Sequence, residues 1–265
     1  MALLHVNFFS EVLGMSMNMD VILPQETKAQ IGMKGRVREG KCPTLYLLHG
    51  MSDDHTIWQR RTSIERYVSE MGLAVVMPTT HLAWYTNTQY GIRYWDFISE
   101  ELPQICRSLF PQLSDRREDT FAAGLSMGGY GAFKLGLRCP EAFGAVASLS
   151  GALDVIGEYQ DFDMDQRAPF WEGIFGNLPD AAGGENDLMA AAEELAKSAR
   201  PKPKLYMWCG RQDFLYQQNL TAAARLRELG YDVTFEESDG GHEWTRWDAK
   251  IQDILAWLPL EKEMG

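Results

Sequence analysis

The sequence predicts an α/β protein in which helices cover both faces of a mostly parallel sheet. Two observations lead to this prediction. Short, continuous apolar runs of the kind found in strands buried on both faces recur along the chain, and segments with helical spacing of apolar residues separate them. The 265 residues are enough for one large core, and no linker interrupts them, so residues 1–265 are expected to form a single domain.

The first half of the chain supplies the first five expected strands. Two strand-like runs open the sequence, and the later runs are almost wholly apolar, as buried strands are. The expected strands are 3–12, 15–23, 44–50, 73–78 and 120–124. Apolar residues at helical spacing predict helices over 57–71 and 92–109.

The second half continues the alternation, with one interruption. A helix rich in small residues follows residue 126, and the remaining expected strands are 143–151, 204–210 and 233–237. Helices are expected over 187–198, 219–229 and 248–258. Residues 155–200 are acidic, aromatic and loop-like up to 187, so we expect a small cap-like excursion there.

The amino-acid composition argues against several classes of function. With 25 basic and 37 acidic residues, the net charge of −12 argues against nucleic acid or an anionic membrane as a partner. No apolar stretch reaches membrane-spanning length, and no basic segment precedes the first apolar residues. The four cysteines show no C-x-x-C pair and no metal-ligand spacing, which favours free thiols in a reducing compartment. A cytoplasmic protein without a metal is therefore expected.

The stretch FAAGLSMGGYG at 121–131 reads as an apolar strand that runs through G-x-S-x-G into a helix. Such a strand-to-helix turn holds Ser126 in a strained conformation with its hydroxyl exposed above the sheet. The glycines two residues before and after it let neighbouring backbone pass without a Cβ clash. The pattern predicts a nucleophilic serine.

A serine nucleophile needs a base and an acid, and both candidates also follow strands. His242 stands in GGHEW after the last strand, and Asp213 stands in CGRQDF after the strand 204–210. The order Ser, Asp, His is typical of hydrolases built on this turn. Imidazole can take up the serine proton near neutral pH, and a carboxylate behind it fixes its tautomer. Asp154, after the preceding strand, is the alternative acid.

Two backbone amides are expected to stabilise the oxyanion that forms during acyl transfer. One belongs to Met127, directly after the nucleophile. The other belongs to Met51, in the tripeptide His49-Gly50-Met51 at the end of the strand 44–50. Gly50 lets the chain turn so that the Met51 amide points inward, and His49 is interpreted as shaping that turn.

These motifs together resemble the esterase D family of α/β-hydrolases, and within it the bacterial tributyrin esterases and other short-chain carboxylesterases. The matching stretches are TLYLLHGM (44–51), WYTNTQYG (84–91), ELP (101–103), GLSMGGYGAF (124–133), SGAL (150–153), CGRQDFLY (209–216) and GHEW (241–244). The resemblance implies the α/β-hydrolase fold and cofactor-independent hydrolysis of short-chain acyl esters. It also implies the Ser126, Asp213 and His242 triad and the oxyanion amides of Met51 and Met127.

The leading hypothesis is therefore a serine carboxylesterase that acts on small esters through an acyl-enzyme. Trp84, Tyr85, Phe214 and Trp244 are expected to contact the substrate, because aromatic side chains commonly wall such pockets. Two alternatives stay open: a feruloyl, cinnamoyl or acetyl esterase on plant-derived saccharides, and a thioesterase of the S-formylglutathione type. The latter needs cations near the site, for which the candidates are Arg93, Arg211 and Arg246. Nothing in the sequence fixes the symmetry of a homo-oligomer.

Overall fold

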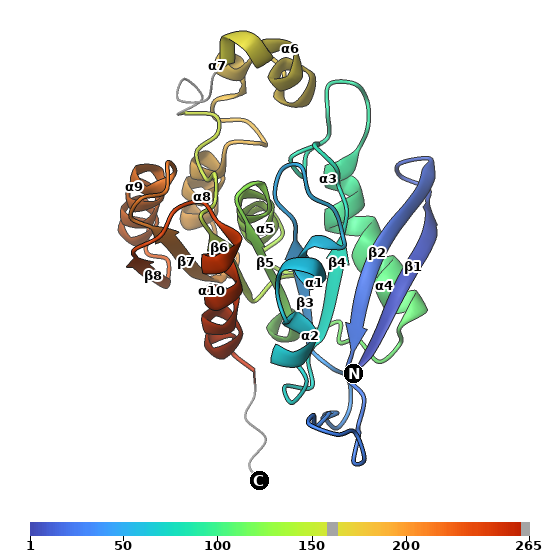
Figure 1. Cartoon of the computed structure of the whole chain (residues 1–265). Helices are drawn as coiled ribbons and strands as arrows, with labels where there is room; N and C mark the ends of the chain where they lie inside the picture. The colour runs from blue at the N-terminus through green and yellow to red at the C-terminus, as the bar shows by residue number, and fades with distance from the viewer. Residues whose placement is uncertain (158–163, 261–265) are drawn as a thin grey trace.

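The computed structural model describes residues 1–157 and 164–260. Its strands are β1 (Ala2–Ser10), β2 (Met15–Leu23), β3 (Thr44–Leu48), β4 (Ala74–Pro78), β5 (Thr120–Leu125), β6 (Ala145–Leu149), β7 (Lys204–Gly210) and β8 (Val233–Ser238). They form one sheet in the order β1-β2-β4-β3-β5-β6-β7-β8 (Figure 1). Strands β3 to β8 pair in parallel, while β2 pairs antiparallel with both β1 and β4. The predicted fold class is confirmed.

Burial explains why these segments are strands. Every residue of β3, β4, β5 and β6 is buried, as expected for apolar runs with helices on both faces. The edge strand β1 instead alternates between partly buried and exposed residues, because only one of its faces meets the core. The first strand, β1, and the last strand, β8, belong to the same sheet. We infer from this that residues 1–265 form one domain.

Two helical layers enclose the sheet, each over its own apolar core. One face is covered by α1 (Ile57–Arg61), α2 (Ile64–Tyr67) and α10 (Trp244–Trp257). The other face is covered by α4 (Leu102–Leu109), α5 (Met127–Arg138), α8 (Leu188–Lys197) and α9 (Tyr216–Glu228). A short helix α3 (Tyr94–Asp96) and a short π-helix η1 (Phe97–Glu101) lead into α4.

Two expected helices differ most from the structure. The segment 57–71 holds two short helices, because the Thr62 hydroxyl accepts a hydrogen bond from the Ile64 amide and so competes with continuous helix. The last helix begins at Trp244 instead of Asp248. Its early start places an aromatic first turn directly after His242, with consequences for the site below.

The expectation of a loop over 155–187 was wrong at 164–175 and 178–181, which are helical. Helices α6 (Met164–Phe175) and α7 (Leu178–Ala181) lie above the sheet at the top of Figure 1. Aromatic packing explains α6, since Trp171 and Phe175 contact the ring of Trp84. Helix α8 instead packs against α5 in the layer below. The part of the expected excursion at 158–163 lies outside the described residues.

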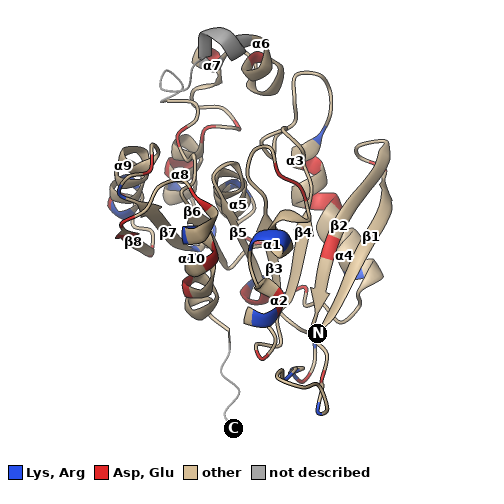
Figure 2. Ribbon diagram, in the orientation of Figure 1, with Lys and Arg blue, Asp and Glu red and all other residues tan. Residues whose placement is uncertain are grey.

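Charged residues of both signs are spread over the fold (Figure 2). Basic residues mark α1 and α2, and acidic residues mark β2 and the segment that leads into α4. Among the helices in the described part of the chain, none has the length and apolar character needed to cross a membrane.

Candidate active site

Ser126 lies between β5 and α5 in a conformation that L-residues seldom adopt, with φ 52° and ψ −119°. The glycines around it are required by close backbone contacts. A Cβ on Gly124 would lie 2.3 Å from the Gly128 carbonyl oxygen, and one on Gly128 would lie 2.5 Å from the Leu48 carbonyl oxygen. The tight turn expected from G-x-S-x-G is therefore present, and its strain is a common mark of a functional position.

Backbone hydrogen bonds hold this turn in place. The Ser126 amide donates to the Leu149 carbonyl at 3.0 Å, and the Ala152 amide donates to the Ser126 carbonyl at 3.3 Å. Both partners belong to β6 and the loop after it, so the end of the neighbouring strand fixes the backbone of the nucleophile. The geometry follows from the parallel pairing of β5 with β6.

The structure brings His242 and Asp213 together. The Nδ1 atom of His242 lies 2.9 Å from Oδ2 of Asp213, and Oδ1 of Asp213 accepts from the Leu215 amide at 2.9 Å. Burial works to raise the pKa of the Asp213 carboxyl, but its hydrogen bonds and the nearby His242 outweigh burial and lower that pKa. An ionised carboxylate at Nδ1 leaves Nε2 as the ring nitrogen that can accept a proton from a nucleophile.

All three residues follow parallel strands, and the loops after β5, β7 and β8 meet at one edge of the sheet. Asp154, the alternative acid, lies in a loop of its own. Its carboxylate accepts from the Gly157 amide at 2.9 Å, and burial raises its pKa. Of the two candidate acids, Asp213 is therefore the one that hydrogen-bonds to the imidazole of His242.

His49 is the buried first residue of the expected oxyanion loop, and its hydrogen bonds connect the loop to its surroundings. Its Nδ1 donates to the Gly50 carbonyl at 2.7 Å, and its Nε2 accepts from the Thr80 amide at 3.0 Å. The Tyr85 hydroxyl donates to the His49 carbonyl at 2.8 Å. These contacts agree with the interpretation of His49 as the residue that shapes the turn.

The two expected oxyanion donors flank the place where this loop meets the nucleophile helix. A Cβ on Gly128 would lie 2.7 Å from the His49 carbonyl oxygen, so the loop and the first turn of α5 are in backbone contact. Met127 is the first residue of α5, and the amide of such a residue has no acceptor within its helix. Met51 follows Gly50 on the facing loop.

The four aromatic residues expected at the substrate occupy different environments. Phe214 is 69% exposed, and its ring lies 4.7 Å from that of His242. Trp244 is half-buried in edge contact with Trp58 and Trp247. Trp84 and Tyr85 are buried, in consecutive left-handed conformations with φ 52° and 51°. Phe214 is thus the one most open to a bound molecule.

A buried lysine, for which no role was expected, links the aromatic loop to the nucleophile helix. Lys134 of α5 donates to the Thr86 hydroxyl at 2.9 Å and to the Asn186 side chain at 2.7 Å, and its ammonium lies 4.4 Å from the centre of the Trp95 ring. Burial lowers its pKa to about 7. The sequence offers no sign of this, because a lysine on a helix is usually exposed.

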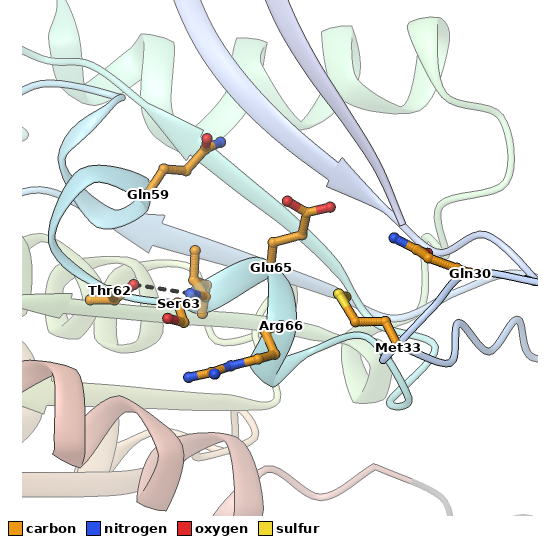
Figure 3. Close-up of a pocket in the computed structure, with 8 residues that line it drawn as sticks. Gln30, Met33, Gln59, Thr62, Ser63, Glu65 and Arg66 are labelled. Carbon is orange, nitrogen blue, oxygen red and sulfur yellow. Dashed lines mark hydrogen bonds between the residues drawn. The ribbon is translucent and has the colours of Figure 1, made fainter.

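A pocket of about 330 Å³ lies beside α2 and the loop before β3 (Figure 3). Its lining is mixed in polarity and includes no member of the expected triad. The lining residues are Gln30, Met33, Gln59, Thr62, Ser63, Ile64, Glu65 and Arg66. Among the described residues, no group of three or more His, Cys, Asp or Glu side chains gathers to hold a metal ion.

Comparison with known proteins identifies the family of this chain. The family described as "Putative esterase" matches residues 10–258. The chain belongs to this family. It is 33% identical to an acetyl esterase of Caldicellulosiruptor saccharolyticus over 264 residues, which covers 97% of this chain and 98% of the relative.

Two solved structures from Staphylococcus aureus are also similar to this esterase. The fluorophosphonate-binding serine hydrolase FphF has a TM-score of 0.84 and 35% identity, with 98% of this chain and 99% of the other covered. The S-formylglutathione hydrolase FrmB has a TM-score of 0.83 and 35% identity, with 97% and 98% covered. The predictions of an esterase of the α/β-hydrolase fold and of a serine carboxylic-ester hydrolase are confirmed.

The first prediction for the esterase concerns Met51. If its amide is the oxyanion donor, Met51→Ala should leave kcat within about threefold of wild type, because the backbone N–H is retained. Loss of a donor itself costs on the order of 3 kcal/mol, or about a hundredfold in kcat. Steady-state kinetics on a p-nitrophenyl ester measures the difference, and a hundredfold loss in the alanine variant would contradict the backbone assignment.

A second prediction concerns acid stability. Burial lowers the pKa of His49 from 6.5 to about 4. Between these pH values the unfolded chain binds a proton that folded His49 does not, so the free energy of unfolding should fall as pH drops through this window. The full effect is on the order of 3 kcal/mol. Asp53 opposes it, because burial raises the pKa of that carboxyl to about 6 and favours its protonated folded form.

Urea unfolding of wild type and His49→Gln between pH 7 and 4 isolates the histidine, because Asp53 acts in both proteins. The variant should be less stable at pH 7 and lose less stability on acidification. Parallel pH profiles for the two proteins would show that His49 titrates alike in the folded and unfolded chain.

Proposed function

We propose that this esterase hydrolyses short-chain acyl esters of small molecules, with Ser126 as nucleophile, His242 as general base and Asp213 as the acid that orients it. The observation that supports this most is the 2.9 Å contact between His242 and Asp213, at the sheet edge where strained Ser126 also lies. Ser126 attacks the acyl carbon as its proton passes to His242. The imidazolium then protonates the leaving alkoxide, and water releases the acid by the same steps.

The aromatic cluster beside α5 favours a short acyl group. Trp84 contacts the rings of Tyr130, Trp171 and Phe175 at 5.2–5.9 Å, and all four side chains are buried. Packed rings fill the side of the nucleophile helix beneath α6. A long alkyl chain would have to displace them, whereas an acetyl or butyryl group would not.

A thioesterase on S-formylglutathione is the second candidate, because FrmB is similar over nearly the full length of both chains. The expected cations argue against it. Arg93 pairs with Asp96, and Arg211 pairs with Glu237 and Asp239. Arg246 lies 3.5 Å from Glu243. Each guanidinium thus has a carboxylate partner within the chain and is less available to the carboxylates of glutathione.

A substrate series tests this proposal. The p-nitrophenyl esters of acetate, butyrate and octanoate vary acyl length alone, and methyl ferulate and S-formylglutathione represent the alternatives. We expect kcat/KM to be highest for acetate or butyrate and at least about tenfold lower for octanoate, since a poorly accommodated chain loses a few kcal/mol of binding. A kcat/KM for S-formylglutathione above that of every oxygen ester would favour the thioesterase, and preference for methyl ferulate would favour the feruloyl esterase.

A cytoplasmic location belongs to the same proposal. Cys42, Cys106, Cys139 and Cys209 are all free thiols in the structure, which suits a reducing compartment. The site is built from one chain, so a homo-oligomer is compatible with it but not required. No cofactor enters the proposed steps.

A further inference from the structure

The loop after β6 contains a second strained residue close to the proposed acid. Ser150 has φ 48°, a left-handed conformation that non-glycine residues adopt at a cost, and its side chain is fully buried. Its amide donates to the Trp208 carbonyl of β7 at 2.7 Å. Strain of this kind persists only where surrounding contacts hold it, and it commonly marks a functional position.

The strained conformation of Ser150 places its hydroxyl among several hydrogen-bonding partners. The Trp247 indole Nε1 donates to Ser150 Oγ at 3.1 Å. The oxygen is thereby an acceptor, and the single hydroxyl proton is left to donate. Two side chains compete for that proton, since hydrogen bonding from Ser150 opposes burial and acts to lower the pKa of both the Asp213 carboxyl and the Cys209 thiol. We assign the proton to Asp213, because an ionised carboxylate is a much stronger acceptor than a thiol.

Trp247 also contacts the proposed base directly. Its ring meets the ring of His242 edge-on, with centroids 4.7 Å apart and planes at 88°. These four side chains therefore contact one another in a ring. Trp247 donates to Ser150, Ser150 donates to Asp213, Asp213 accepts from His242, and His242 packs against Trp247. Trp247 lies in the first turn of α10, which begins at Trp244, and His242 lies in the loop that ends directly before this helix.

We propose that Ser150 and Trp247 are positioning residues that hold the Asp213 carboxylate in line with Nδ1 of His242. The inference rests on the proposed roles of Asp213 and His242. Two of the carboxylate's partners, the Leu215 amide and the His242 ring, come from loops at the edge of the sheet. Ser150 adds a third donor from the neighbouring strand end, and Trp247 fixes that hydroxyl. Ser150 acts on the carboxylate and Trp247 packs against the imidazole ring, so both act through the proposed acid and base.

Three variants separate the hydroxyl from other contributions. Ser150→Ala removes the hydroxyl and keeps the strained backbone, whereas Ser150→Gly removes the hydroxyl and relieves the strain. Trp247→Phe keeps an aromatic ring but lacks the N–H donor. We expect both Ser150 variants to lower kcat by about tenfold to a hundredfold, the loss typical of one hydrogen bond to a charged group, with KM within about threefold. Trp247→Phe should lower kcat less, because the Ser150 hydroxyl remains.

A double-mutant cycle with Asp213→Ala provides the decisive comparison, using a fluorogenic ester sensitive enough for the residual activity. If Ser150 acts through the carboxylate, Ser150→Ala should lower kcat in wild type and have no further effect when Asp213 is alanine. Thermal unfolding of every variant checks that the fold is retained.

The possible outcomes are distinct. An equal loss from Ser150→Ala in both backgrounds would overturn the inference and leave the proposed triad intact. Wild-type kcat in Ser150→Gly would overturn it as well, because the hydroxyl would then be dispensable. Full activity of Asp213→Ala alone would reject the proposed triad, and the inference would fall with it.

Discussion

Ser126→Ala should reduce kcat by on the order of a millionfold while the protein still folds. The alanine cannot form the acyl-enzyme, and no other step of the proposed mechanism can replace it. Far-UV circular dichroism should be unchanged, since the Ser126 backbone is held by its amide and carbonyl, which alanine retains. Burst-phase and steady-state kinetics on p-nitrophenyl acetate measure the loss. Residual turnover above about one per cent would mean that another residue is the nucleophile.

Ser126→Gly is the matched control for the strain at this position. It is equally unable to form an acyl-enzyme, but glycine adopts a φ of 52° without a Cβ penalty. The glycine variant should therefore be more stable than the alanine variant by about 1 kcal/mol, measured by urea unfolding. Equal stability would show that the turn stores no strain.

Asp213→Asn should lower kcat by about four orders of magnitude, with a much smaller change in KM. An asparagine amide can retain the shape of the side chain but cannot stabilise the imidazolium, and it favours the wrong tautomer of His242. Activity should therefore be lost at every pH at which the wild type works.

Asp154→Asn is the control for this prediction. The Asp154 carboxylate accepts a hydrogen bond from the Gly157 amide of the same loop. Loss of this carboxylate should therefore change kcat by no more than about threefold. Both variants are assayed at the pH optimum of the wild type with matched enzyme preparations. A mild effect at Asp213 together with a large effect at Asp154 would reverse the assignment of the acid.

The nucleophile turn could be predicted from the sequence because its causes are local. Gly124 and Gly128 occupy positions where any Cβ would clash with backbone, so the spacing itself encodes the turn. Asp213 and His242 could also be predicted from the sequence, because the loops that follow parallel strands all lie at one edge of the sheet. These inferences needed only strand order and residue chemistry.

Other features depend on contacts between distant segments. Burial of Lys134 requires Thr86 and Asn186, which lie 48 and 52 residues away in sequence. Helix α6 depends on Trp84 in the same manner, since the aromatic contacts that explain it come from another loop. Ser150 has no local signal either, because its strained conformation appears only when β7 and α10 are in place.

The central claim is that Ser126 is a nucleophile activated by His242, and covalent labelling tests it most directly. The protein is treated with a fluorophosphonate probe, digested, and the modified peptide is mapped by mass spectrometry. We predict one adduct on Ser126, absent in Ser126→Ala and formed at least about a hundredfold more slowly in His242→Ala. No adduct, an adduct on another residue, or undiminished labelling without His242 would contradict the account.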